Sequence, residues 1–291
     1  MRTICTILFN IIIIITCVSN SFGETAQNIM KKSLERNDGD TWMARVQISS
    51  CRTTTKGRKI MCAEKARTKQ IEEIRKDYEK HDLDTKQVMI IREPASEKGI
   101  GFLQFDYESA DKQSDQWMYL SAIGKVKRLV SGDENKPKTG SFFGTELNYE
   151  DVEKRRLLNY KYKLLREEVY KKRQCYVIES IPTPQYAQRS NYSKIIDWID
   201  KETNIPLNTI LFDRKGRQVK QISRSMIEKI NGIWTWRTQV VNNLITNRLS
   251  FFKILKAAYN FPVIDEFLTQ RTLTDASFCE RHLNDYRSNL R

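Results

Sequence analysis

The sequence predicts a mainly β fold, built as one large antiparallel sheet or barrel with a few helices. Three observations support this prediction. Short apolar strand patterns follow one another at regular spacing, with turn formers between them, which is typical of β-sandwiches and barrels. Several strand segments carry large apolar side chains on both faces, which indicates either helix cover or a sheet curved around a cavity. No change in composition marks a domain linker within the 291 residues.

The first 23 residues have the pattern of a signal peptide and are not expected to belong to the fold. Arg2 supplies a positive start, Ile4 to Val18 is an apolar run, and Ser21-Phe22-Gly23 offers small residues to a signal peptidase. The alternative is an uncleaved membrane anchor, but the run is short for a span of about 20 residues. We therefore expect cleavage after Gly23 and export of the mature chain.

The N-terminal part of the mature chain is predicted to form one helix followed by strands. Apolar residues at helical spacing over 24–36 indicate the helix, and turn formers at 37–40 end it. Alternation over 42–49 is typical of a half-buried strand. Residues 59–78 are ambiguous between strand and helix, and their sparse apolar residues favour a strand. Further strands are expected at 87–92, 99–107, 117–120 and 125–130.

The second half is predicted to continue the same sheet. After its last strand we expect a short connection at 253–260 and a final helix at 265–273. The mature chain is thus expected to form one domain over 24–273, followed by a polar C-terminal tail over 274–291. Its strands are expected at 160–167, 174–180, 192–200, 208–212, 219–223, 226–230, 233–241 and 244–252.

Export would place the cysteines in an oxidising compartment. The mature chain retains four of them, at Cys51, Cys62, Cys175 and Cys279, which allow three pairings. Cys51 and Cys62 flank a turn at 53–57, so a bridge between these two across a hairpin is geometrically reasonable. A zinc site needs closer ligand spacing, with only His81 and His282 to assist. We predict no metal site and no cofactor.

The chain is strongly basic, with 50 Lys and Arg against 36 Asp and Glu and a net charge of +14. Loss of Arg2, the only charged residue in 1–23, reduces this to +13. Basic proteins often bind nucleic acid, but export argues against that partner. An anionic membrane surface is the partner that the compartment allows, and solubility alone is the alternative. Lys125, Lys127 and Arg128 are the predicted basic surface.

No catalytic constellation is present in the sequence, so an enzyme is not predicted. Two histidines leave little for a Ser-His-Asp arrangement, and no H-E-x-x-H, P-loop or G-x-G-x-x-G sequence occurs. Adjacent acids such as Glu72-Glu73 and Glu167-Glu168 would point to opposite faces of a strand and could not flank one substrate.

Five stretches match motifs of one family. They are KGIGFL at 98–103, QWMYL with KVKRL at 116–129, SFFGTELNYED at 141–151, WIDKETNIPL at 198–207 with FDRKG at 212–216, and the C-terminal stretch DEFLTQRTL at 265–273. With them the chain resembles outer membrane lipoprotein-sorting proteins of the LolA-like superfamily, in the larger periplasmic branch associated with RND-type exporters. It departs from the family at Ser121, where proline is usual, at 145–147, and over 59–84.

The resemblance implies a strongly curved, unclosed antiparallel β-barrel with helices covering the open side, as in LolA and LolB. It also implies a periplasmic carrier that holds lipid or lipoprotein acyl chains in an apolar cavity for transfer between membranes, together with an exporter. The alternative is a non-transporting periplasmic adaptor or sensor that binds an exporter or a signalling protein through the same fold.

Large aromatic residues on the predicted strands are the candidates for lining such a cavity. For each of them the alternative is ordinary core packing. These candidates are Phe102, Phe105, Trp117, Tyr119, Trp198, Phe212, Trp234 and Trp236.

Overall fold

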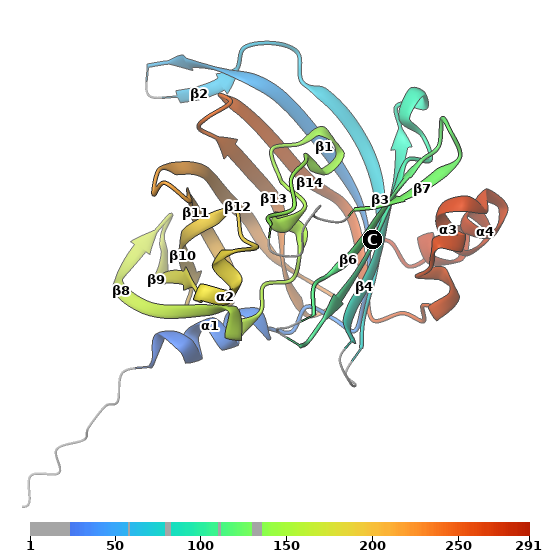
Figure 1. The fold of residues 1–291 in the computed structure, drawn as a ribbon. Helices are drawn as coiled ribbons and strands as arrows, with labels where there is room; N and C mark the ends of the chain where they lie inside the picture. The colour runs from blue at the N-terminus through green and yellow to red at the C-terminus, as the bar shows by residue number, and fades with distance from the viewer. Residues whose placement is uncertain (1–23, 58, 79–82, 110–111, 130–135) are drawn as a thin grey trace, which may run out of the picture.

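The computed structural model describes residues 24–57, 59–78, 83–109, 112–129 and 136–291. The predicted signal peptide lies outside the described residues and stays a prediction. Within these ranges fourteen strands form one antiparallel sheet (Figure 1). They are β1 (Thr41–Lys56), β2 (Lys59–Cys62), β3 (Arg67–Asp77), β4 (Leu83–Glu93), β5 (Gly101–Tyr107), β6 (Asp115–Leu120), β7 (Lys125–Arg128), β8 (Tyr160–Tyr170), β9 (Arg173–Pro182), β10 (Tyr192–Asp200), β11 (Pro206–Asp213), β12 (Gln218–Ile230), β13 (Ile233–Asn243) and β14 (Arg248–Tyr259).

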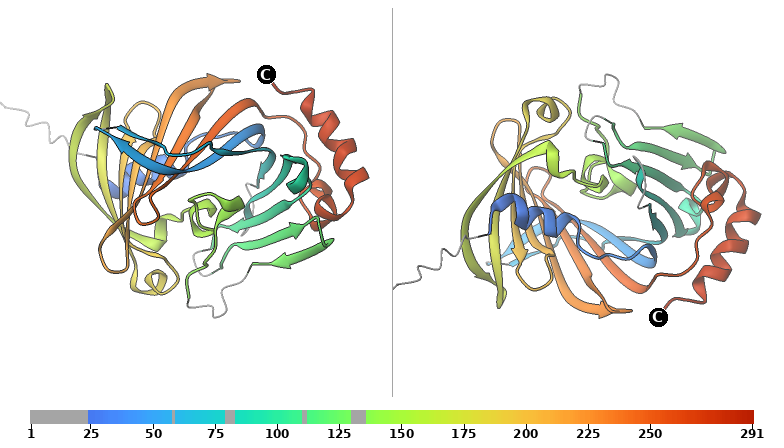
Figure 2. Two further views of the ribbon diagram at one scale, coloured as in Figure 1. Left: turned by 90° about the horizontal axis from the view of Figure 1, so that it is seen from above. Right: turned by 90° about the horizontal axis from the view of Figure 1, so that it is seen from below.

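The sheet is curved into an unclosed barrel, which confirms the predicted fold class. Its strand order is β7-β6-β5-β4-β3-β1-β14-β13-β12-β11-β10-β9-β8, and β2 pairs with β1 outside this order. The pairing of β1 with β14 places Trp42 opposite Tyr259 and joins segments that are remote in sequence. Among the described strands, β7 and β8 are the two edges, and they do not pair with each other. Figure 2 shows the two halves curving around a common interior.

Helices are short and few in the described residues. No helix in this part of the chain is both long and apolar enough to cross a membrane. The α-helices are α1 (Ala26–Leu34), α2 (Pro184–Ala187), α3 (Gln270–Thr274) and α4 (Ala276–Arg287). Single 3-10 turns are η1 (Ala95–Glu97), η2 (Phe142–Gly144), η3 (Glu150–Val152), η4 (Leu157–Asn159) and η5 (Asp265–Phe267).

Helix α1 forms where the sequence predicts it and covers one end of the barrel interior (Figure 2). The Thr25 hydroxyl caps it by accepting the backbone N–H of Asn28 at 3.2 Å. Ile29 and Met30 are buried against the inner side of β9, where they meet Ile178. The helix therefore closes part of the interior from solvent.

Both faces of the sheet are buried at β1, β4 and β5, which explains the large apolar residues on both sides of these strands. On β1, Trp42 and Val46 belong to the inner core, whereas Met43 belongs to an outer cluster. Successive side chains of a strand point to opposite faces. The outer cluster is formed between the sheet and the C-terminal helices α3 and α4. From the sheet it includes Val88, Ile90 and Leu103, and from the C-terminal segment Phe267, Leu268, Leu273, Phe278 and Leu283. Helix cover and an internal cavity, which the sequence leaves as alternatives, thus occur together.

Three predicted boundaries in the second half are wrong. The patterns at 219–223 and 226–230 belong to one strand, β12, which keeps the same register with β13 on both sides of Met226. Met226 has a φ of 56° and no partner residue on β13. The predicted connection at 253–260 is mostly the end of β14. The predicted helix at 265–273 is a 3-10 turn followed by the short α3.

The expectation of a polar tail over 274–291 is also wrong, because most of this segment is helix α4. Asp275 caps the helix by accepting the backbone N–H of Phe278 at 2.9 Å. Phe278 and Tyr286 are buried on the outer face of the sheet. The helix has one narrow apolar stripe among polar residues, so its composition resembles that of a solvated segment.

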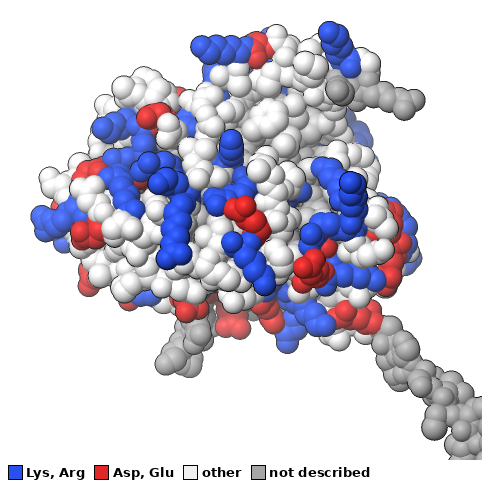
Figure 3. Space-filling model, turned by 180° about the vertical axis from the view of Figure 1, so that it is seen from behind, with Lys and Arg blue, Asp and Glu red and all other residues white. Residues whose placement is uncertain are grey.

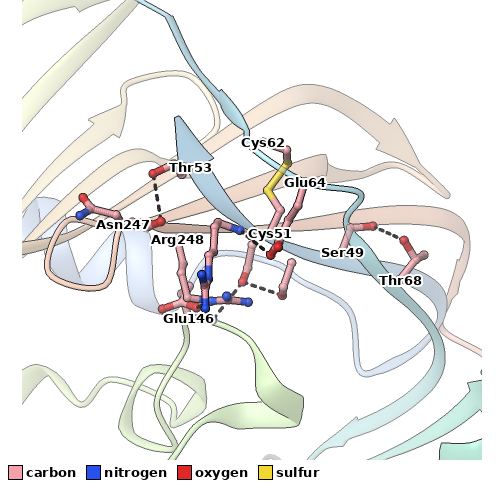
Figure 4. The surroundings of a disulfide bond; sticks show 12 residues. Ser49, Cys51, Thr53, Cys62, Glu64, Thr68, Glu146, Asn247 and Arg248 are labelled. Carbon is pink, nitrogen blue, oxygen red and sulfur yellow. Dashed lines mark hydrogen bonds and ion pairs between the residues drawn. A yellow bond between two sulfur atoms is a disulfide. The ribbon is translucent and has the colours of Figure 1, made fainter. Parts of the chain in front are cut away.

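A disulfide ties β2 to β1 (Figure 4), which confirms the bridge suggested for Cys51 and Cys62. Their sulfur atoms lie 2.03 Å apart. The segment 59–78, for which the sequence favours a strand, holds β2 and β3. Cys175 and Cys279 are buried free thiols, so the second bridge that four cysteines permit does not form. Burial raises the pKa of Cys175 to about 11 and that of Cys279 to about 12, which keeps both protonated at neutral pH.

Candidate functional site

The interior of the barrel is crossed by residues 136–159, which we call the inner segment (Figure 2). Phe142, Phe143 and Leu147 of this segment are buried in the inner core. The ring of Phe142 contacts that of Phe102 at 5.2 Å between centroids. The inner segment therefore fills part of the hollow and contributes to the lining of two cavities.

The first cavity is apolar over most of its lining and has a volume of about 260 Å³. This is close to the lower end of the range of ligand pockets, about 300–1,000 Å³. Its lining consists of inward-facing strand residues and side chains of the inner segment. The apolar and aromatic members are Trp42, Val46, Ile71, Met89, Phe142, Leu147, Val152, Trp234, Trp236, Phe252, Ile254 and Tyr259.

The second cavity is polar and has a volume of about 330 Å³. It adjoins the first, because Arg36, Asp38, Arg75, Gln87 and Asp151 line both. The interior is therefore apolar only in part, which corrects the expectation of a simple apolar cavity. The charged lining residues of the polar cavity are Arg36, Asp38, Arg75, Asp77, Asp106, Glu150, Asp151, Glu153, Lys154, Arg155, Asp197 and Arg224.

The deepest ion pair of the polar cavity joins the inner segment to β12. Lys220 Nζ lies 2.5 Å from Asp151 Oδ2, and both side chains are almost fully buried. The Tyr192 hydroxyl donates to Asp151 Oδ1 at 2.7 Å and accepts from Lys220 Nζ at 3.0 Å. Burial and the Asp151 carboxylate raise the pKa of Tyr192, so its hydroxyl stays a donor. This cluster fixes the position of Asp151.

Glu150, the neighbour of Asp151, faces a different set of donors. Its carboxylate accepts from Ser190 Oγ at 2.5 Å and from the backbone N–H and Nδ2 of Asn191 at 2.7 and 2.6 Å. Burial nevertheless raises the pKa of Glu150 to about 7. The carboxyl group therefore titrates near neutral pH while it anchors the inner segment to the loop before β10.

Arginines pair with acids on the other walls of the polar cavity. Arg155 Nη1 lies 2.6 Å from Asp197 Oδ2, and Arg75 lies 3.3 Å from Asp38 and 3.0 Å from Asp77. Burial raises the pKa of Asp77 to about 6. Charges that line the cavity are thus largely compensated within the protein.

Two of the predicted lining residues, Trp234 and Trp236, do line the apolar cavity. Phe102 faces the interior but packs against Phe142, Phe143 and Tyr149, so it supports the inner segment and lines neither cavity.

Phe105, Trp117 and Tyr119 do not line the interior. They pack in the outer cluster beneath the C-terminal helices, where the rings of Phe105 and Trp117 lie 5.0 Å apart. The intervening residues Gln116 and Met118 face inward instead. The prediction chose the wrong face of β6, since both faces carry large residues and the alternation alone does not say which is inside.

Trp198 and Phe212 also lie away from the two cavities. Asp197 on β10 lines the polar cavity, so the next residue, Trp198, points to the outer face of the sheet. There Trp198 packs with Cys175 and Val177. Phe212 lies under Lys194, whose Nζ is 4.5 Å from the ring centroid.

The sequence prediction missed the charged lining altogether. Asp197, a charged residue between Ile196 and Trp198 on an otherwise apolar strand, was an available signal, but the sequence does not say which face of the strand is inside. The alternation over 42–49 places Trp42 and Val46 on one face of a strand, but it does not predict that this face lines a cavity. Their assignment requires the pairing of β1 with β14, which sequence spacing does not reveal.

The predicted basic surface is exposed. Lys125, Lys127 and Arg128 lie on β7, an edge strand, and Arg128 pairs with Asp115 on β6. Lysines on an edge strand also discourage pairing with other chains, which is the structural alternative to a binding role.

These features define a class: an unclosed antiparallel barrel with a partly apolar interior cavity. The model of a family of uncharacterized proteins matches residues 83–275, more than half of the chain. The chain belongs to that family. No curated protein sequence matches it.

Solved structures confirm the resemblance to LolA-like proteins at the level of fold. A domain from Vibrio parahaemolyticus, described as an outer membrane lipoprotein-sorting protein, is 23% identical with a TM-score of 0.73 over 86% of this chain and 98% of its own. A DUF1329 family protein from Desulfovibrio piger is 23% identical with a TM-score of 0.74 over 85% and 97%. A LolA superfamily protein from Nitrosomonas europaea is 18% identical with a TM-score of 0.62 over 85% and 98%.

Proposed function

We propose that this protein is a non-enzymatic carrier, exported to the periplasm, that holds acyl chains of a lipid or lipoprotein for transfer between membranes. The apolar cavity inside the barrel carries this proposal. Its walls include Trp42, Phe252 and Ile254, which are buried and line an unfilled volume of about 260 Å³. Each methylene buried there would contribute about 0.8 kcal/mol.

The neighbouring polar cavity supports an amphiphilic ligand over a purely apolar one. An acyl chain in the apolar cavity would leave its polar end beside Arg36 and Asp38, which line both cavities. The apolar cavity, at about 260 Å³, lies just below the range of ligand pockets, about 300–1,000 Å³. Its size therefore suits part of one acyl chain rather than several chains.

The experiment is to purify the mature protein without detergent and to identify bound lipid by extraction and mass spectrometry. The proposal predicts a bound amphiphile at a fixed ratio to protein. If no lipid is found and labelled acyl chains do not bind, the carrier proposal is wrong.

An adaptor that binds an RND-type exporter or a signalling protein is the second candidate. The exposed basic residues of β7, Lys125 and Lys127, favour it because they lie on an edge strand and no ion pair of theirs occurs among the described residues. Crosslinking in cells that recovers no membrane protein would contradict this candidate.

An anionic membrane surface is a further proposed contact, supported by the charge of +14. On the face drawn in Figure 3, Lys and Arg side chains are spread widely, with Asp and Glu among them. Such a spread also fits a solvated surface. Co-sedimentation with vesicles containing anionic lipid, compared with neutral vesicles, distinguishes the two.

A further inference from the structure

Arg224 differs from the other cations that line the polar cavity. Its Nη1 donates to the backbone oxygen of Pro206 at 2.9 Å, and among the described residues it has no carboxylate within ion-pairing distance. The other four each have an acid within 4.0 Å: Arg36 with Asp38, Arg75 with Asp38 and Asp77, Lys154 with Asp84, and Arg155 with Asp197.

The surroundings of Arg224 add positive charge. Burial and the nearby guanidinium groups of Arg36 and Arg155 lower the pKa of Arg224 to about 10, and only Asp197 opposes this. Asp197 is already held by Arg155 and by the Thr209 hydroxyl, which donates at 2.7 Å. The Arg36 Nε is itself buried without a hydrogen-bond partner. Two guanidinium groups in one cavity thus have donors to spare.

The acids of the cavity do not supply the missing anion, because each is engaged elsewhere. Their partners are Arg75 for Asp38 and Asp77, Ser114 and Gln104 for Asp106, Ser190 and Asn191 for Glu150, Lys220 and Tyr192 for Asp151, and Lys138 for Glu153.

Arg224 also lies next to the apolar cavity. Its guanidinium carbon is 5.9 Å from the ring centroid of Trp236, which lines that cavity. Arg36 lines both cavities. An anion at Arg224 would therefore be close to an acyl chain in the apolar cavity.

We propose that Arg224, assisted by Arg36, binds an oxyanion group, a phosphate or a carboxylate, in the polar cavity. A half-buried cation without an anion is unfavourable, and an incoming oxyanion would compensate it. The planar guanidinium suits two-point contact with such a group. The inference rests on the proposed function for the source of the anion. If the protein is a carrier, the oxyanion is the headgroup of the amphiphile whose acyl chain lies in the apolar cavity. A free anion is the other source.

The test compares three probes, dodecyl phosphate, dodecanol and inorganic phosphate, by titration calorimetry at pH 7.5 on the full mature protein. The variants are Arg224→Gln, Arg224→Lys and Arg36→Gln. Arg217→Gln is the matched control, because Arg217 is an exposed arginine on the turn before β12.

We expect Arg224→Gln to weaken dodecyl phosphate binding at least about tenfold, since charged hydrogen bonds typically contribute that much, and to leave dodecanol binding unchanged. The affinity of Arg224→Lys for dodecyl phosphate should lie between those of the wild type and Arg224→Gln. Arg36→Gln should bind this probe severalfold more weakly than the wild type, and Arg217→Gln should bind it equally. The thermal midpoint of Arg224→Gln should not fall, because the variant removes a half-buried charge that has no anionic partner among the described residues.

Two results overturn the inference. One is that dodecyl phosphate binds equally to the wild type, Arg224→Gln and Arg36→Gln. The other is that neither dodecyl phosphate nor inorganic phosphate binds to the wild type. Should Arg224→Gln fail to fold, Arg224→Lys and Arg36→Gln decide. If inorganic phosphate binds as tightly as dodecyl phosphate and Arg224→Gln weakens both, the anion site stands and the carrier proposal is contradicted. If dodecanol and dodecyl phosphate bind equally, the carrier proposal stands and the anion site is wrong.

Discussion

Glu72 on β3 accepts two hydrogen bonds from Arg287 on α4, from Nη2 at 2.5 Å and from Nε at 2.8 Å. Arg45 donates to the same carboxylate at 3.0 Å. Glu72 is almost fully buried, and burial opposes its ionisation, yet the bonds from Arg287 and Arg45 lower its pKa. This carboxylate therefore fastens the C-terminal helix to the outer face of the sheet.

Replacing Glu72 with Gln should destabilise the protein by about 1.5–3 kcal/mol at pH 7, because the half-exposed guanidinium groups of Arg287 and Arg45 would lose their charge-assisted hydrogen bonds. Urea unfolding measures the loss, and hydrogen exchange should show faster exchange in α4. Glu228→Gln is the control, since Glu228 pairs with Arg237 at the surface and its loss should change stability by less than about 1 kcal/mol. Similar effects of the two substitutions would contradict the assignment.

The Glu72 contribution should depend on pH in a defined direction. Because the pKa is lowered in the folded state, the stabilisation is present above the unfolded value of 4.5 and is lost as the pH falls through the folded value. The difference in stability between wild type and Glu72→Gln should accordingly shrink in acid.

Glu150 should show the opposite pH dependence. Its folded pKa of about 7 lies above the unfolded value of 4.5. Its contribution is therefore complete below pH 4.5 and is lost as the pH rises toward 7. Relative to Glu150→Gln, the wild type should lose on the order of 1–3 kcal/mol across this window, measured by urea unfolding. Glu266→Gln, at an exposed position, is the control; a constant difference for Glu150→Gln would contradict the assignment.

The Cys51–Cys62 disulfide should stabilise the β1–β2 hairpin. We expect the double substitution Cys51→Ala with Cys62→Ala to lower stability by about 2–3 kcal/mol, because the bridge restricts the unfolded chain. Dithiothreitol should lower the urea midpoint of the wild type and leave that of the double variant unchanged. A wild-type midpoint insensitive to dithiothreitol would show that the bridge contributes nothing.

The sequence was sufficient to predict the strands and the fold class, because alternation and turn chemistry are local. It was insufficient for choosing the face of a strand. Trp117 and Tyr119 lie under α3 and α4, and the cover that makes their face the outer one comes from residues more than a hundred positions away. Helix α4 itself was missed because its apolar stripe is narrow.

The polar cavity was hidden for a related reason. Asp151, Asp197 and Arg224 come from the inner segment, β10 and β12. They line one cavity only because the curved sheet surrounds the inner segment. By contrast, the Cys51–Cys62 bridge could be suggested from sequence, because both partners lie on one hairpin.

The most direct test of the carrier proposal is to fill the apolar cavity and measure acyl binding. Val46 is buried and lines that cavity, so Val46→Trp should occupy the space of the chain. Val169→Trp, at a side chain 60% exposed on β8, is the matched control. With a fluorescent fatty acid as probe, we predict that Val46→Trp binds at least about tenfold more weakly than the wild type, while Val169→Trp binds equally. Equal binding by all three folded proteins, or no binding by the wild type, would contradict the account.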